Sequence, residues 1–132
     1  MQEFQFSSHS GMQLQGYRWV PQGEPVAVVQ ILHGVAEYAL RYDAFARFLS
    51  GQGFLVVAHD HMGHGKSGGT PLHFPDGWAA VREDCHTVYG LLRKEYPHLP
   101  YVLFGHSMGS FLLRSLLYTH PEMELSCAVI CG

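Results

Sequence analysis

The sequence contains only three cysteines among 132 residues, too few and too odd a number for a disulfide framework. We therefore expect a reducing compartment and a cytoplasmic location. Cys127 and Cys131 lie four residues apart in a short apolar segment, so both would face the same side of a strand. No paired metal ligands stand near them in the sequence. They are predicted to be small buried hydrophobic residues.

Charged residues are also scarce, and basic residues do not outnumber acidic ones. Charged residues make up 14% of the chain, against about 25% in an average soluble domain. Lys and Arg number 8 and Asp and Glu number 11, which gives a net charge of −3. Nucleic-acid binding depends on a basic excess that releases counterions from phosphates. No nucleic-acid partner is therefore expected.

Long hydrophobic runs are absent as well. Residues 54–58 form one of the longer apolar runs, far short of the roughly 20 residues that cross a bilayer. Residues 1–5 show no basic patch leading into an apolar stretch, so we predict neither a signal peptide nor a transmembrane segment. Hydrophobic residues still make up 47% of the chain. This share excludes disorder and predicts one folded domain over residues 1–132.

Strand-like and helix-like segments alternate along the chain. The segments with strand character are residues 3–6, 12–19, 26–32, 54–58, 101–104 and 128–131. The segments with helical periodicity are residues 43–52, 78–96 and 111–118. This alternation predicts an α/β fold with a mostly parallel sheet, helices on both faces and an antiparallel N-terminal edge. Ligands bind beyond the carboxyl ends of strands in such sheets, so the loops after Leu32, Ala58 and Phe104 are the informative ones.

The loop after Ala58 matches two phosphate-binding patterns only superficially. Gly63, Gly65 and Gly68 have the spacing of a dinucleotide-binding loop, but no helical pattern begins before Trp78 to receive a pyrophosphate. Read as a P-loop, the segment has a carboxylate where the first glycine is required, and that carboxylate would repel phosphate. We therefore interpret the glycines as turn residues of a structural loop, and no cofactor is expected.

The same loop offers a metal-binding alternative through His59, His61 and His64. Their spacing resembles the zinc-binding histidine cluster of metallo-β-lactamase-like hydrolases. That pattern has an aspartate directly before its last histidine, and Gly63 stands there instead. A metal-dependent hydrolase therefore stays open as a minor alternative.

The loop after Phe104 carries the strongest chemical signal. Residues 105–109 read Gly-His-Ser-Met-Gly and stand between a predicted strand and a predicted helix. The G-x-S-x-G pattern in this context is typical of a nucleophile elbow, a sharp turn that projects a serine hydroxyl. Gly105 and Gly109 would let neighbouring segments approach without Cβ clashes. Ser107 is therefore the predicted nucleophile.

Acyl transfer also needs hydrogen-bond donors for the oxyanion. The backbone amide of Met108, directly after the predicted nucleophile, would supply one donor. The amide of Val35 would supply the other, because Gly34 lets the loop after the earlier strand turn toward the site. We interpret His33 and His106 as hydrogen-bonded supporting residues rather than as catalytic bases.

These motifs together resemble one branch of a known superfamily. The matching segments are residues 33–37, 41–42, 60–67 and 105–109. They resemble the monoacylglycerol lipase and lysophospholipase branch of the α/β-hydrolases, also labelled serine-aminopeptidase-like hydrolases, over about residues 14–132. The resemblance implies that Ser107 accepts the acyl group and that Val35 and Met108 form the oxyanion hole. It also implies that the loop over residues 60–67 is structural.

The part of the chain after Ser107 lacks a plausible acid and base. In this fold the triad runs in the order Ser, Asp or Glu, then His. The 25 residues from 108 to 132 hold no aspartate, and their histidine, His120, would lie roughly 20 Å away at the far end of a helix. The resemblance implies that these residues are the N-terminal portion of an α/β-hydrolase domain, with the lid, the acid and the base beyond Gly132. Its last strand would be an exposed edge, through which the chain would self-associate.

The predicted function is a serine ester hydrolase that acts on a lipid or small carboxylic ester through an acyl-enzyme. The 132-residue chain itself would be weakly active or inactive. The alternatives are a non-catalytic binding protein that keeps half the fold, an aminopeptidase that uses the same machinery, and the metal-dependent hydrolase described above.

Overall fold

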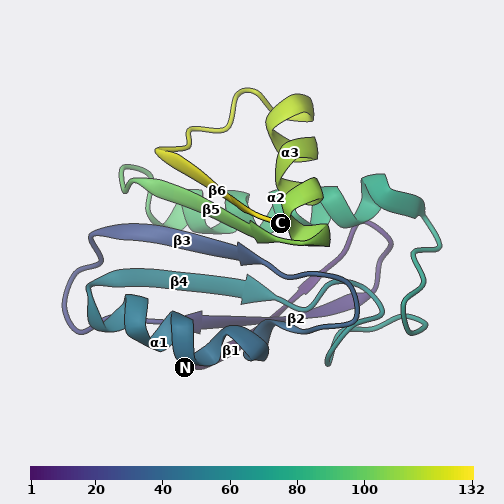
Figure 1. Ribbon diagram of the computed structural model, residues 1–132, viewed down its shortest axis with the longest axis horizontal. Helices are drawn as coiled ribbons and strands as arrows, with labels where there is room; N and C mark the ends of the chain where they lie inside the picture. The colour runs from purple at the N-terminus through teal and green to yellow at the C-terminus, as the bar shows by residue number, and fades with distance from the viewer.

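The computed structural model describes residues 1–132 as one six-stranded sheet with helices on both faces (Figure 1). The strands are β1 (Gln2–Ser7), β2 (Gln13–Trp19), β3 (Ala27–Leu32), β4 (Phe54–His59), β5 (Tyr101–His106) and β6 (Cys127–Cys131). The helices are the short 3₁₀ helix η1 (Ala39–Tyr42), α1 (Asp43–Gly51), α2 (Gly77–Glu95) and α3 (Met108–Thr119). No helix combines the length and the apolar character that spanning a membrane requires.

The strands lie in the order β1-β2-β4-β3-β5-β6 across the sheet. β1 pairs with β2, and β2 with β4, in antiparallel fashion. The β3–β4, β3–β5 and β5–β6 pairs are parallel. This arrangement confirms the predicted parallel sheet with an antiparallel N-terminal edge.

Local sequence explains most of the element boundaries. Every residue of β3 is buried, as expected for a central parallel strand covered on both faces. Gly53 follows α1 with φ 96°, a left-handed conformation that ends helices and favours glycine. Two boundaries differ from expectation. Helix α3 begins directly after Ser107 rather than near Ser110, and η1 was not predicted because its four residues carry no helical periodicity.

Two hydrophobic cores lie on opposite faces of the sheet. The larger one packs α2 and α3 against the sheet and includes the fully buried Val81 and Val88 of α2. The smaller one packs η1 and α1 against the other face and includes Ala46 and Trp19. Trp78, in the first turn of α2, is 38% exposed.

β6 corrects one expectation about the cysteines. Cys127 and Cys131 were predicted to be buried, yet all five residues of β6 are exposed. The reason is the position of the strand: β6 is the last strand of the sheet and pairs only with β5. Cys85, by contrast, is fully buried in α2.

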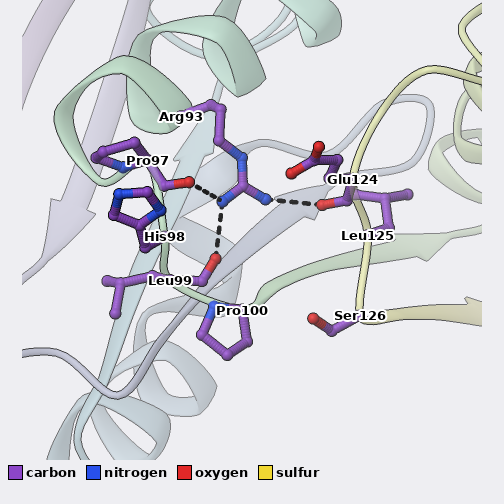
Figure 2. A pocket seen from close by; sticks show the side chains of 8 residues that line it. All are labelled: Arg93, Pro97, His98, Leu99, Pro100, Glu124, Leu125 and Ser126. Carbon is purple, nitrogen blue, oxygen red and sulfur yellow. Dashed lines mark hydrogen bonds between the residues drawn. The ribbon is translucent and has the colours of Figure 1, made fainter.

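Arg93 ties the end of α2 to the segment that enters β6. Its guanidinium donates hydrogen bonds to the carbonyl oxygens of Leu99 at 2.8 Å, Glu124 at 2.7 Å and Pro97 at 3.4 Å (Figure 2). The guanidinium also lies 5.3 Å from the ring centre of Tyr101. The cavity in Figure 2 lies at the amino end of β5, so it is at the opposite end of the strand from Ser107.

Replacement of this guanidinium should destabilise the fold. We expect Arg93→Ala to lower the free energy of unfolding by about 1–2 kcal/mol, because three exposed or half-buried carbonyls lose their charge-assisted hydrogen-bond donor. Arg93→Lys should restore only part of this loss, since one ammonium group replaces a planar fork of donors. Urea unfolding measures both values. Arg47→Ala is the control, because the exposed Arg47–Asp43 pair contributes about 0.5 kcal/mol or less. Equal losses at Arg93 and Arg47 would contradict this account.

Candidate active site

Ser107 occupies a sharp turn between β5 and α3. Its backbone has φ 52°, a left-handed conformation that non-glycine residues rarely adopt and that often marks functional sites. Hydrogen bonds hold this conformation on both sides of the serine. The Ser107 amide donates to the Cys131 carbonyl at 2.9 Å, and the Ser110 amide and hydroxyl donate to the Ser107 carbonyl at 2.9 and 2.6 Å. Ser107 itself is partly exposed.

The two glycines that flank this turn allow a close backbone approach. A Cβ added at Gly109 would collide with the carbonyl of Leu32, the last residue of β3. A Cβ added at Gly105 would collide with the carbonyl of Gly109. The first turn of α3 therefore lies directly against the carboxyl end of β3. Side chains at either position would push the turn away from the sheet.

The loop after β3 lies against the same turn. A Cβ built on Gly34 would stand 3.1 Å from the Cβ of Ser107 and 3.3 Å from the carbonyl oxygen of His106. Val35, the next residue, is 56% exposed. Ala36 then turns the chain with φ 58°. The structure thus brings together the two loops that were expected to supply the oxyanion donors.

Glu37 holds this loop in place, and sequence reasoning assigned it no role. Its side chain is 7% exposed, and one carboxylate oxygen accepts hydrogen bonds from the Gly34 amide and from the Tyr42 hydroxyl at 2.7 Å. The His106 ring lies 3.2 Å from the same oxygen. The only sequence signal was its place in the motif over residues 33–37.

The charge state of Glu37 follows from these contacts. Burial by itself would raise the pKa of this carboxyl. The hydrogen bonds from Tyr42, the Gly34 amide and His106 outweigh burial and lower the pKa below its ordinary value. Glu37 is therefore a carboxylate at neutral pH, and it acts as an acceptor that joins both loops.

His33 and His61 connect the loop after β3 to the loop after β4. The His61 amide donates to Nε2 of His33 at 3.0 Å, so Nδ1 of His33 carries the proton and donates to the Gly34 carbonyl at 2.7 Å. Nε2 of His61 in turn lies 3.0 Å from the His33 carbonyl. Burial lowers the pKa of His33 to about 4 and that of His61 well below its ordinary value. Both rings are therefore neutral and serve as hydrogen-bond bridges.

The metal alternative receives little support from this arrangement. His59 and His61 approach each other, with ring nitrogens 3.3 Å apart, but the third group near them is the Cys85 thiol and not His64. Nδ1 of His64 instead lies 2.9 Å from the Met62 carbonyl. The structure does not bring the three expected histidines into one set of ligands.

Asp60 organises the glycine-rich loop after β4. Its carboxylate accepts hydrogen bonds from the Ala39 amide at 2.7 Å, the Lys66 amide at 2.9 Å and the Tyr17 hydroxyl at 3.2 Å. A Cβ on Gly65 would collide with this carboxylate. Asp60 occupies the position where a P-loop requires its first glycine. In this structure its carboxylate connects the glycine-rich loop to η1.

The histidine and the glutamates that follow Ser107 in the sequence lie beyond the last residue of α3. His120 follows the last residue of α3 and contacts Glu83 and Glu122. The backbone amide of Glu124 donates a hydrogen bond to the Tyr89 hydroxyl oxygen at 2.9 Å. The Ser107 hydroxyl has no histidine or carboxylate partner within residues 1–132.

Comparison with known proteins places the chain among hydrolases. Residues 23–132 match the family model described as Hydrolase_4: Serine aminopeptidase, S33. The monoacylglycerol lipase of Mycolicibacterium smegmatis is 37% identical over 130 residues, which cover 98% of this chain and 46% of that protein. Human monoglyceride lipase is 44% identical over 91 residues, which cover 69% of this chain and 30% of that protein.

A solved structure shows the same relation. The carboxyl esterase from Bacillus coagulans superposes with a TM-score of 0.88 at 34% identity. The superposed region covers 99% of this chain and 44% of the esterase chain. The chain therefore spans less than half the length of these relatives.

Glycine-to-alanine substitutions at two positions test the close approach at the turn. We expect Gly109→Ala to lower the free energy of unfolding by about 1–3 kcal/mol, because the methyl group collides with the β3 carbonyl. Gly90→Ala should have the opposite sign and stabilise by about 0.5–1 kcal/mol, since Gly90 lies in α2 with open space around it. Urea unfolding of both variants measures the difference. A neutral Gly109→Ala would refute the packing argument.

The contribution of Glu37 should depend on pH in a definite direction. Its folded pKa is lower than its ordinary value, so the ionised group stabilises the fold above about pH 4.5. That stabilisation is lost as the pH falls through the lowered folded pKa. We expect Glu37→Gln to cost about 1–3 kcal/mol at pH 7 and progressively less below pH 4.5. Urea unfolding at a series of pH values measures this, with the exposed Glu24→Gln as a control that should show a near-constant, small difference.

Proposed function

The chain belongs to the serine aminopeptidase (S33) family and has the α/β-hydrolase fold, and on this basis we propose that it supplies the nucleophile of an ester hydrolase. The observation that carries the proposal is the conformation of Ser107. This serine has φ 52° at the junction of β5 and α3, with the loop after β3 against its Cβ. A strained strand-to-helix turn of this kind is how the fold projects a nucleophilic serine.

In the proposed reaction, Ser107 Oγ attacks the ester carbonyl carbon, and a new C–O bond forms as the carbonyl oxygen becomes an oxyanion. The amides of Met108 and Val35 would donate hydrogen bonds to this oxyanion. The Met108 amide belongs to the first turn of α3, where the helix dipole also favours negative charge. Support for Val35 comes from the short separation between Gly34 and Ser107.

The rest of the cycle needs a general base. The base takes the Ser107 proton and gives it to the leaving alcohol, and it then activates the water that hydrolyses the acyl-enzyme. No group within residues 1–132 lies in position for this role. We place the acid, the base and the lid in the part of the fold that this chain does not span, and we expect the chain alone to be weakly active or inactive.

The substrate class is a lipid or small carboxylic ester. This choice is favoured by the relatives, which are named monoacylglycerol lipase, monoglyceride lipase and carboxyl esterase. An aminopeptidase would use the same acyl-enzyme chemistry, and the family description allows it, but none of these relatives is named as a peptidase. No cofactor takes part in the proposed reaction. A cytoplasmic location is proposed from the free thiols of all three cysteines.

The non-catalytic alternative and self-association depend on the same surface. β6 leaves its outer edge unpaired, and apolar Val129 and Ile130 are 39% and 43% exposed. An exposed apolar strand edge pairs readily with another chain. We propose that two copies of the 132-residue chain associate through β6.

Covalent labelling tests the nucleophile. A fluorophosphonate probe should label the chain extended to the full length of its family, and mass spectrometry should locate the adduct on Ser107. Ser107→Ala should lose this labelling completely, because the other hydroxyl at the turn, that of Ser110, is buried and donates to the Ser107 carbonyl. Ser115→Ala, a substitution farther along α3, is the matched control and should label normally.

Two outcomes would reject the serine mechanism. Labelling that survives in Ser107→Ala would place the nucleophile elsewhere. Ester hydrolysis that a chelator abolishes and Ser107→Ala leaves intact would instead favour the histidine-based metal mechanism.

A further inference from the structure

Away from Ser107, four titratable side chains gather where α2 meets the end of α3. Glu83 and His86 lie three residues apart on α2, a spacing that places both on one face of the helix. His120 directly follows α3, and Glu122 lies two residues further on. None of these four side chains takes part in the proposed ester hydrolysis.

The distances within this cluster are short. Nε2 of His120 lies 2.9 Å from both carboxylate oxygens of Glu83, and its Nδ1 lies 3.0 Å from Glu122. Nε2 of His86 lies 3.8 Å from the same Glu122 oxygen. The rings of His86 and His120 are nearly parallel, with centres 3.8 Å apart. One ligand atom from each of Glu83, His86 and His120 lies within 4.8 Å of the others.

Two imidazoles and the Glu83 carboxylate form a ligand set suited to a borderline metal ion. Zinc binds His nitrogen and Glu oxygen at about 2.0–2.2 Å in tetrahedral sites, which puts ligand atoms roughly 3.3 Å apart. The cluster therefore needs inward movements on the order of 1 Å to reach this geometry. We propose that Glu83, His86 and His120 form a surface site for a divalent transition metal ion such as Zn²⁺, with the Glu122 carboxylate beside it.

The electrostatics of the cluster agree with such a site. The two carboxylates carry a charge of −2, and His120 lies between them. The Glu83 carboxylate lies at Nε2 of His120 and the Glu122 carboxylate at its Nδ1, so anionic oxygens surround the imidazole nitrogens. A divalent cation bound by Glu83, His86 and His120 would offset this negative charge.

Access and support also favour this cluster. Its side chains are partly exposed, so an ion can enter from solvent, and Arg82 donates to Glu83 at 2.9 Å and orients that carboxylate. The buried group of His59, His61 and Cys85 has similar separations but is fully enclosed. That group is therefore the weaker candidate.

An ion at this site would link α2 to the end of α3. Since α3 begins directly after Ser107, the metal would fasten the end of the helix that lies away from the serine. Its expected effect is on the stability of the α2–α3 packing and not on the chemical step. The inference therefore stands independently of the proposed ester hydrolysis.

Calorimetric titration with Zn²⁺ tests the site directly. The exposed thiols of Cys127 and Cys131 would bind zinc themselves, so the titration uses a Cys127→Ser/Cys131→Ser background without an affinity tag. We expect one equivalent to bind. His86→Ala and Glu83→Gln should each raise the Kd for zinc by about tenfold or more, as loss of metal-site residues typically does.

The control is His73→Ala, which removes an exposed histidine outside the cluster and should leave Kd unchanged. Thermal unfolding gives a second readout. At a zinc concentration about 100-fold above Kd, the melting midpoint of the background protein should rise by roughly 5 °C or more. This rise should disappear in His86→Ala, whose apo form is compared at the same time to detect any loss of folding.

Three results would overturn the proposal. These are no binding by the folded background protein, equal binding by His86→Ala and Glu83→Gln, or equal loss of affinity in His73→Ala. None of these readouts depends on ester hydrolysis, so failure here and failure of the serine mechanism are separate results.

Discussion

The close backbone approach of α3 to the carboxyl end of β3 is the constraint on which the candidate site depends. Gly109 has no room for a side chain because the Leu32 carbonyl lies where its Cβ would stand. This contact sets how near the turn at Ser107 comes to the loop after β3. The left-handed backbone of Ser107 is kept by the hydrogen bonds on either side of it. Packing at the two glycines and strain at the serine are thus parts of one arrangement.

A network of buried polar side chains holds the loops beside the turn at Ser107. Glu37 accepts three hydrogen bonds on one oxygen, and His33 and His61 pass hydrogen bonds between the loops after β3 and β4. Burial keeps both of these imidazoles neutral, so they connect the loops by directional hydrogen bonds and add no charge. Asp60 does the equivalent for the glycine-rich loop. Polar groups with satisfied partners make loops rigid, because each lost hydrogen bond would leave an unpaired group in a low-dielectric environment.

The two ends of the sheet differ in how well they are covered. The central strands β3 and β4 are enclosed by helices on both faces, whereas β6 is exposed along its whole length. The relatives are more than twice as long as the segment that this chain matches. In the proposed reaction, the general base for Ser107 would come from a part of the fold that this chain does not span. The cluster of Glu83, His86 and His120, where α2 meets the end of α3, lies wholly within residues 1–132.

Local sequence determined the strands, the helices and the turn at Ser107. Alternation and helical periodicity act over a few residues, and G-x-S-x-G between a strand and a helix is a local signal. Only the tertiary structure decided which side chains meet across the chain: Glu37 with His106, and Glu83 and His86 with His120. It also decided that Cys127 and Cys131 are exposed, because burial depends on whether another element covers a strand. Such contacts join residues far apart in sequence, and no short-range pattern records them.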